Sequence, residues 1–182
     1  MNRKEAELLD RRTGEYLFQT AKAFHMDESF AASIMEQYLE IIPESDKKEI
    51  VFLGTDSFSV KPGNIKLNMK KLLAACAELF VSVNAPENIF NYIQLALMAF
   101  MFAAKTTVKT LNSDCAVIIY TLDQLGACES YVTESRLEEA ALRICTETGR
   151  PPISAFRDSL NQLLELQVIK MEDGKVTLQE TV

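Results

Sequence analysis

Histidine, proline and glycine are scarce in this sequence of 182 residues, and each shortage excludes a class of site or segment. The one histidine, His25, rules out a histidine-rich metal site, and any Ser-His-Asp or Cys-His mechanism would have to use it. Its place at the end of a predicted helix is more typical of a capping or surface residue. Five prolines and six glycines are too few for long low-complexity linkers. The 48% of hydrophobic residues is enough for a buried core.

The sequence also lacks the short motifs that mark common catalytic and phosphate-binding sites. It contains no G-x-S-x-G, no G-x-x-x-x-G-K-[ST] and no G-x-G-x-x-G. Two pairs of carboxylates, Glu36 with Glu40 and Glu134 with Glu138, share a helix face, which is also the usual pattern of a solvated helix surface. We therefore predict no catalytic residue, no metal site and no cofactor.

The cysteine pattern is not that of a zinc or redox site, because no two cysteines form a C-x-x-C pair. The charged amino terminus, Met1–Glu5, does not resemble a signal peptide. Free thiols in a reducing cytoplasm are the simplest expectation for all the cysteines, which are Cys76, Cys115, Cys128 and Cys145.

The strongest candidate for a membrane segment is the apolar stretch Ile89–Ala104. Its 16 residues are fewer than the about 20 that a helix needs to cross a bilayer, and it contains Asn91 and Gln94. We expect a helix that is buried on most faces of a water-soluble core instead. The methionine and phenylalanine side chains of this helix are typical of a protein core. The alternative is that they form a homodimer interface.

Acidic residues are concentrated in the carboxy-terminal part of the chain. The net charge is −7, but residues 1–112 carry 13 Lys/Arg and 14 Asp/Glu, a net of −1. Residues 113–182 carry 6 Lys/Arg and 12 Asp/Glu, a net of −6. An acidic surface is repelled by nucleic acid, because binding depends on cations that neutralise phosphates.

The amino-terminal part begins with two predicted helices. The first covers about 4–25 and is expected to break or kink near Thr13-Gly14. The second covers about 28–42, with Asp27 as its N-cap and Pro43 at its end.

A β-hairpin is predicted next, near 57–67, around the turn Pro62-Gly63-Asn64. Asn68 can then cap a helix that ends near Val83, and an apolar helix follows over 87–109. The two helices are expected to pack as a helical hairpin over 69–109, which completes an amino-terminal domain of residues 1–112.

The second predicted domain, residues 113–182, contains three short helices followed by a hairpin. The helices cover about 114–125, about 134–148 and a segment that begins after Ser154, with Ser113 and Thr133 as the N-caps of the first two. Two alternating segments then flank the turn Glu172-Asp173-Gly174-Lys175, and an Asp-Gly turn between such segments is a strong indication of a β-hairpin.

Three short helices followed by a hairpin resemble the winged helix-turn-helix family, and the segment SLNQLLELQVIKMEDGKVTLQE, Ser159–Glu180, is similar to its third helix and wing. Gln167 stands where family members often place glycine at the exit of the third helix. The resemblance implies a mainly α fold with a two-stranded wing, and a third helix that contacts the DNA major groove or another protein.

Carried over to this sequence, the resemblance selects candidate contact residues on the third helix and on the wing. They are Ala155, Arg157, Asp158, Asn161, Gln162 and Glu165 on the helix and Lys170, Glu172, Asp173 and Lys175 on the wing. Arg157, Asn161 and Gln162 are of types that can read bases. However, the helix offers one cation against two anions, and the wing has no net positive charge.

We therefore expect a non-catalytic adaptor or regulatory subunit whose acidic winged helix contacts another protein. The alternative is a winged-helix transcriptional regulator that binds DNA, as a dimer. The third interpretation is an enzyme of unrecognised type.

Overall fold

The computed structural model describes residues 1–43, 64–82, 86–106 and 110–182. Over these ranges the protein is mainly helical and has two small antiparallel sheets, which confirms the predicted fold class at this level. None of the described helices combines the length and the apolar character that a bilayer crossing requires.

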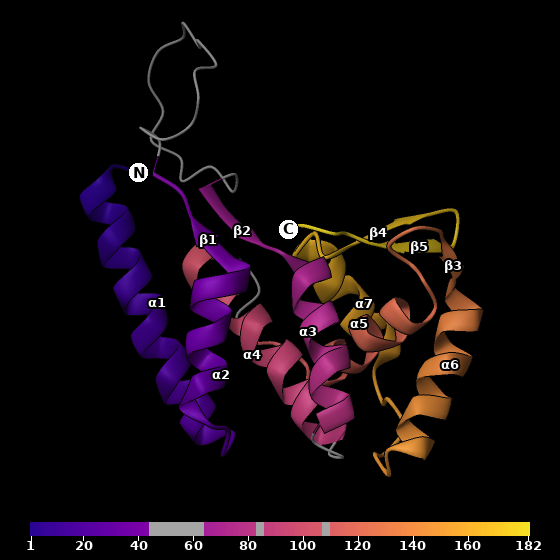
Figure 1. The fold of residues 1–182 in the computed structure, drawn as a ribbon. Helices are drawn as coiled ribbons and strands as arrows, with labels where there is room; N and C mark the ends of the chain where they lie inside the picture. The colour runs from indigo at the N-terminus through magenta and orange to yellow at the C-terminus, as the bar shows by residue number, and fades with distance from the viewer. Residues whose placement is uncertain (44–63, 83–85, 107–109) are drawn as a thin grey trace, which may run out of the picture.

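The amino-terminal elements form the left and the centre of the molecule in the view of Figure 1, with α1 at the outer edge. In chain order they are α1 (Arg3–Ala23), α2 (Glu28–Ser33), the π-helical turn η1 (Ile34–Tyr38), β1 (Leu39–Ile41), β2 (Ile65–Leu67), α3 (Met69–Ser82) and α4 (Pro86–Ala104).

Helix α1 is uninterrupted, so the predicted break near Thr13-Gly14 is wrong. The Thr13 hydroxyl donates to the Leu9 carbonyl at 2.8 Å, and this hydrogen bond allows the polar side chain to be fully buried inside a helix. The glycine costs the helix about 1 kcal/mol relative to alanine, which packing against α2 and α4 offsets. The buried stripe of α1 is narrow and consists of Ala6, Thr13, Leu17 and Ala21.

The second helix begins as predicted but ends earlier. The Asp27 side chain accepts a hydrogen bond from the Ser29 amide at 2.8 Å, which confirms the predicted N-cap. After η1 the chain becomes the strand β1, which pairs antiparallel with β2, so the prediction of a helix to residue 42 is wrong in its last residues.

The predicted hairpin near 57–67 falls partly on residues 57–63, which lie outside the described residues. Its second half is a strand, Ile65–Leu67, as predicted. The partner of this strand in the structure is β1, with Leu39 opposite Leu67.

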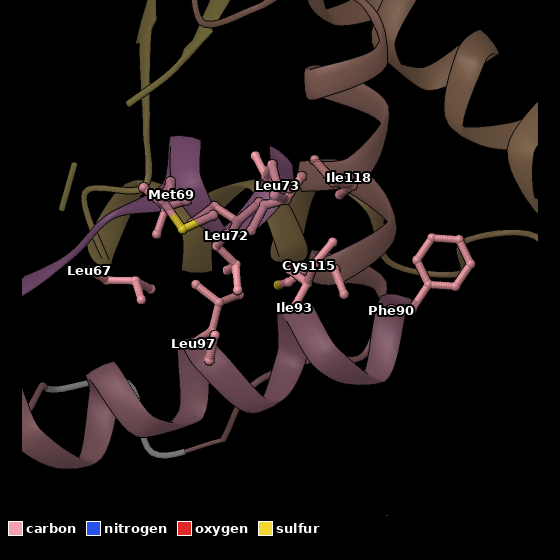
Figure 2. Close-up of a cluster of buried hydrophobic side chains, with 14 of the residues drawn as sticks. Leu67, Met69, Leu72, Leu73, Phe90, Ile93, Leu97, Cys115 and Ile118 are labelled. Carbon is pink, nitrogen blue, oxygen red and sulfur yellow. The ribbon is translucent and has the colours of Figure 1, made fainter. Parts of the chain in front are cut away.

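Helices α3 and α4 pack against each other, and α4 ends at Ala104, short of the predicted residue 109. Asn68 accepts a hydrogen bond from the Lys71 amide at 3.0 Å and so caps α3. Figure 2 shows Leu72 of α3 and Ile93 and Leu97 of α4 pointing toward one another, and all three are fully buried. Helix α4 is buried along most of its length, and the exposed Phe102 stacks on Tyr16 of α1 at 4.5 Å between ring centroids. The homodimer alternative for this helix stays a prediction.

The carboxy-terminal elements lie on the right of Figure 1. They are α5 (Asp114–Gln124), β3 (Val132–Thr133), α6 (Glu134–Glu147), α7 (Phe156–Glu165), β4 (Ile169–Glu172) and β5 (Lys175–Leu178). The three helices and the β4–β5 hairpin were predicted, but β3 was not. It pairs with β5, so that β5 lies in the centre of a three-stranded antiparallel sheet in the order β3-β5-β4.

The helix caps in this part differ from the prediction. Ser113 and Thr133 occupy the N-cap positions of α5 and α6 but make no side-chain capping hydrogen bond. The Asp114 amide donates instead to the Asn112 side chain at 3.0 Å. Helix α7 starts one residue later than predicted, so that Ala155, rather than Ser154, is its N-cap residue.

Residues with positive φ lie at the exit of α7 and in the turn of the hairpin. Gln167, after α7, has a φ of 58°, which is a conformation that glycine adopts most easily. Asp173 and Gly174 have φ values of 49° and 70° between β4 and β5. Positive φ at both central residues is typical of the type I′ turn that Asp-Gly predicts.

The two predicted domains share one continuous hydrophobic core. Helix α4 packs against α5, and Cys115 and Ile118 of α5 lie near α3 and α4 side chains (Figure 2). After β5 the chain returns to β2. There the Leu67 amide donates to the Val182 carbonyl at 2.9 Å, and the Val182 amide donates to the Leu67 carbonyl at 3.1 Å. The division into residues 1–112 and 113–182 stays a prediction.

Candidate functional site

Helix α7 is held by one buried face and exposes the other. Phe156, Ser159, Leu160 and Leu163 are buried, and the helix packs against α5 and β4. The 3.6-residue helical period then directs Arg157, Asp158, Asn161 and Glu165 to solvent, as the sequence predicts.

Arg157 is paired with a carboxylate of the neighbouring helix. Its guanidinium lies 2.9 Å from a carboxylate oxygen of Glu134, the first residue of α6. The Glu134 side chain is 22% exposed and the Arg157 side chain 80% exposed, so the cation remains in water while its charge is balanced at short range. The one cation of α7 is therefore compensated.

Gln162 has a structural role that the sequence did not indicate. Its side-chain oxygen accepts hydrogen bonds from the Asn112 amide at 2.9 Å and from the Cys115 thiol at 3.4 Å. Gln162 therefore connects α7 to the start of α5. Of the three candidates for reading bases, Arg157 and Gln162 are thus engaged within the protein, and only Asn161 has neither a hydrogen bond nor an ion pair to the described part of the chain.

The wing candidates lie on the outer face of the three-stranded sheet. Ile169, Val176 and Leu178 are buried on the inner face, so the alternating Lys170 and Lys175 lie on the opposite, exposed face. Glu172 pairs directly opposite Lys175 across the hairpin, and Asp173 is exposed in the turn.

Tyr131 is an exposed aromatic residue that the sequence did not single out. The Lys175 ammonium lies 4.4 Å from the centroid of its ring, a cation–π contact, and 56% of Tyr131 is exposed. In a recognised strand, the alternation of Tyr131 with the buried Val132 would have predicted that Tyr131 is exposed. The strand β3 has two residues, however, and is too short to be recognised from its sequence pattern.

The described thiols are not activated as nucleophiles. Burial raises the pKa of Cys76 and of Cys115 to about 12 and also raises the pKa of Cys128 and Cys145. All four thiols are free, as predicted. The described ranges hold no cluster of three or more metal-ligating side chains.

The candidate residues are therefore an exposed face of α7, with one paired cation and two carboxylates, and two exposed lysines of the β4–β5 hairpin. Comparison of the chain with protein-family models, with curated proteins and with solved structures found no match.

Proposed function

We propose that residues 113–182 form a winged helix that docks another protein, and that the chain is a non-catalytic adaptor or regulatory subunit. The element order α5-β3-α6-α7-β4-β5 and the sheet order β3-β5-β4 support the winged helix, with α7 as its third helix. Fold alone does not assign a function, so the choice between partners rests on the exposed groups.

The electrostatics of α7 carry this proposal. The one cation of the helix, Arg157, is paired with Glu134, and the two other charged residues of its exposed face, Asp158 and Glu165, are acidic. A third helix in a DNA groove is surrounded by phosphates, and each carboxylate there is repelled. The same helix face suits a protein surface that presents lysine or arginine.

Reversing the acidic charge of α7 tests the docking proposal. A tagged chain carrying Asp158→Lys and Glu165→Lys should lose the proteins that co-purify with the unchanged chain from the native host. The matched control reverses Glu138 and Glu139, which are exposed on α6 and change the net charge by the same amount. Equal retention by both double variants, with native melting temperatures, would contradict the proposal.

DNA binding by a transcriptional regulator is the second candidate, and the two exposed lysines of the wing favour it. Lys170 and Lys175 share the outer face of the sheet, from which a wing can contact the phosphate backbone. Because so few cations are present, we expect no sub-micromolar binding to random duplex DNA at physiological salt. Salt-dependent sub-micromolar binding to random DNA or to DNA from the gene's own neighbourhood, lost in Arg157→Ala or Lys170→Ala, would make DNA binding the better interpretation.

A further inference from the structure

A cleft of about 470 Å³ opens between α2, η1, α3 and α4, and the described residues that line it all belong to these four elements. Its volume falls in the range of roughly 300–1,000 Å³ that small-molecule sites occupy. A π-helical turn forms part of its wall, and such turns often occur at functional sites.

Three aromatic rings form the apolar wall of the cleft. Tyr92 lies between the other two, with the Phe30 ring at 5.3 Å and 66° and the Tyr38 ring at 6.4 Å and 87°. Both are edge-to-face contacts, which fix the relative orientation of the rings. Tyr92 and Tyr38 are buried, so this wall is held rigidly by the core.

The hydroxyl groups of the cleft hydrogen-bond to one another and to acceptors in the protein. The Ser33 hydroxyl lies 2.9 Å from the Phe30 carbonyl, to which it can donate, and 2.6 Å from the Tyr92 hydroxyl, where either oxygen can be the donor. Tyr38 donates to the Gln37 side-chain oxygen at 3.0 Å. Burial raises the pKa of Tyr92, which keeps its phenol protonated in neutral solution.

Ser29, which also lines the cleft, donates its backbone amide to the Asp27 carboxylate at 2.8 Å, and the interactions of the Ser29 side chain and amide hold the pKa of that carboxyl below its usual range. The hydroxyl groups of the cleft thus present oxygen lone pairs that can accept hydrogen bonds from a ligand.

Glu78 contributes the one charge among the described lining residues. Its side chain is exposed, and it makes no hydrogen bond or ion pair to any described residue. A carboxylate in a cleft that also presents hydroxyl oxygens and aromatic rings favours a ligand that donates hydrogen bonds and carries positive charge.

We propose that this cleft binds a small organic amine in its protonated form. The ammonium group has three donors and no acceptor, and it matches Glu78 and the hydroxyl oxygens. The apolar body of the amine lies against Phe30, Tyr38 and Tyr92. An anion would find no cation among these lining residues, and a metal ion would find a single carboxylate.

The test compares three probes that share one ring and differ in head group: 2-phenylethylamine, 2-phenylethanol and 3-phenylpropionate. Each is titrated into the full chain while the tyrosine ring resonances are followed by NMR, with Tyr38→Phe and Tyr92→Phe used for assignment. The amine should shift the Tyr38 and Tyr92 resonances with an affinity about tenfold higher than that of the alcohol, and the acid should bind more weakly still.

A charge variant of the cleft then isolates the role of the carboxylate. Glu78→Gln should reduce the amine affinity about tenfold, to that of the alcohol, and leave the alcohol affinity unchanged. The control Glu36→Gln removes an equivalent exposed charge from η1, outside the cleft lining, and should leave both unchanged. Because no α7 or wing residue lines the cleft, this result is independent of the docking proposal.

Three outcomes would overturn the amine proposal. The first is equal affinity for the amine and the alcohol, and the second is undiminished amine binding by Glu78→Gln. The third is the absence of any shift of the Tyr38 and Tyr92 resonances at millimolar amine.

Discussion

Replacing Leu163 with alanine should lower the free energy of unfolding by about 2–5 kcal/mol. Leu163 is fully buried on the inner face of α7, where the helix packs against α5 and β4. The substitution removes apolar surface worth about 1.5–3 kcal/mol for a whole leucine side chain, and the cavity that remains adds to the loss.

The surroundings of Leu163 favour the upper half of that range. Its carbonyl accepts a hydrogen bond from the Val168 amide at 3.0 Å, across the left-handed Gln167, so the chain is fixed on both sides of the turn into β4. A fixed backbone does not move to fill the cavity, and the loss of stability increases with the volume of the cavity that remains.

Leu164→Ala is the matched control for this measurement. It makes the same chemical change at the next position of the same helix, but Leu164 is only partly buried. We expect a loss of about 1 kcal/mol for Leu164→Ala in urea unfolding followed by circular dichroism. If Leu163→Ala destabilises the protein no more than Leu164→Ala does, the packing of α7 described above is wrong.

Three further predictions concern the backbone, the thiols and the junction of the two halves. Gln167→Gly should raise the free energy of unfolding by about 0.5–1 kcal/mol, because glycine adopts the φ of 58° with less strain; destabilisation would contradict this. In native protein a thiol reagent should react fastest with Cys128, since the other three thiols are buried, and a second fast thiol would disagree. Lys70→Ala should lower the free energy of unfolding by less than about 1 kcal/mol in urea, because both side chains of its ion pair with Glu180, at 2.8 Å, are more than half exposed. A larger loss would mean that this ion pair stabilises the contact between the amino- and carboxy-terminal parts more than its exposure implies.

The sequence predicted the structure best where a local interaction determines it. The N-caps Asp27 and Asn68 and the turn Asp173-Gly174 are of this kind, because the residues that interact are neighbours in the chain. The end of the second helix could not be predicted in this way. Leu39–Ile41 is compatible with a helix, and it forms a strand because β2, far along the chain, pairs with it.

The sequence predicted the exposure of Arg157, Asp158, Asn161 and Glu165 on α7, but not the contacts of the candidate residues. The exposed positions of α7 follow from helical period alone. The pairing of Arg157 with Glu134 and the hydrogen bonds of Gln162 with Asn112 and Cys115 depend on how α7 lies against α5 and α6, which no pattern in the sequence specifies.

Crosslinking from the exposed face of α7 in the native host tests the central proposal most directly. A photo-crosslinking amino acid replaces Asn161, which is exposed and makes no hydrogen bond or ion pair to the described part of the chain. The same amino acid at the exposed Glu139 of α6 serves as the control position. The docking proposal predicts light-dependent adducts with a protein, at a surface rich in lysine and arginine, from position 161 and not from position 139. Adducts with DNA from position 161, or protein adducts of equal yield from both positions, would contradict it.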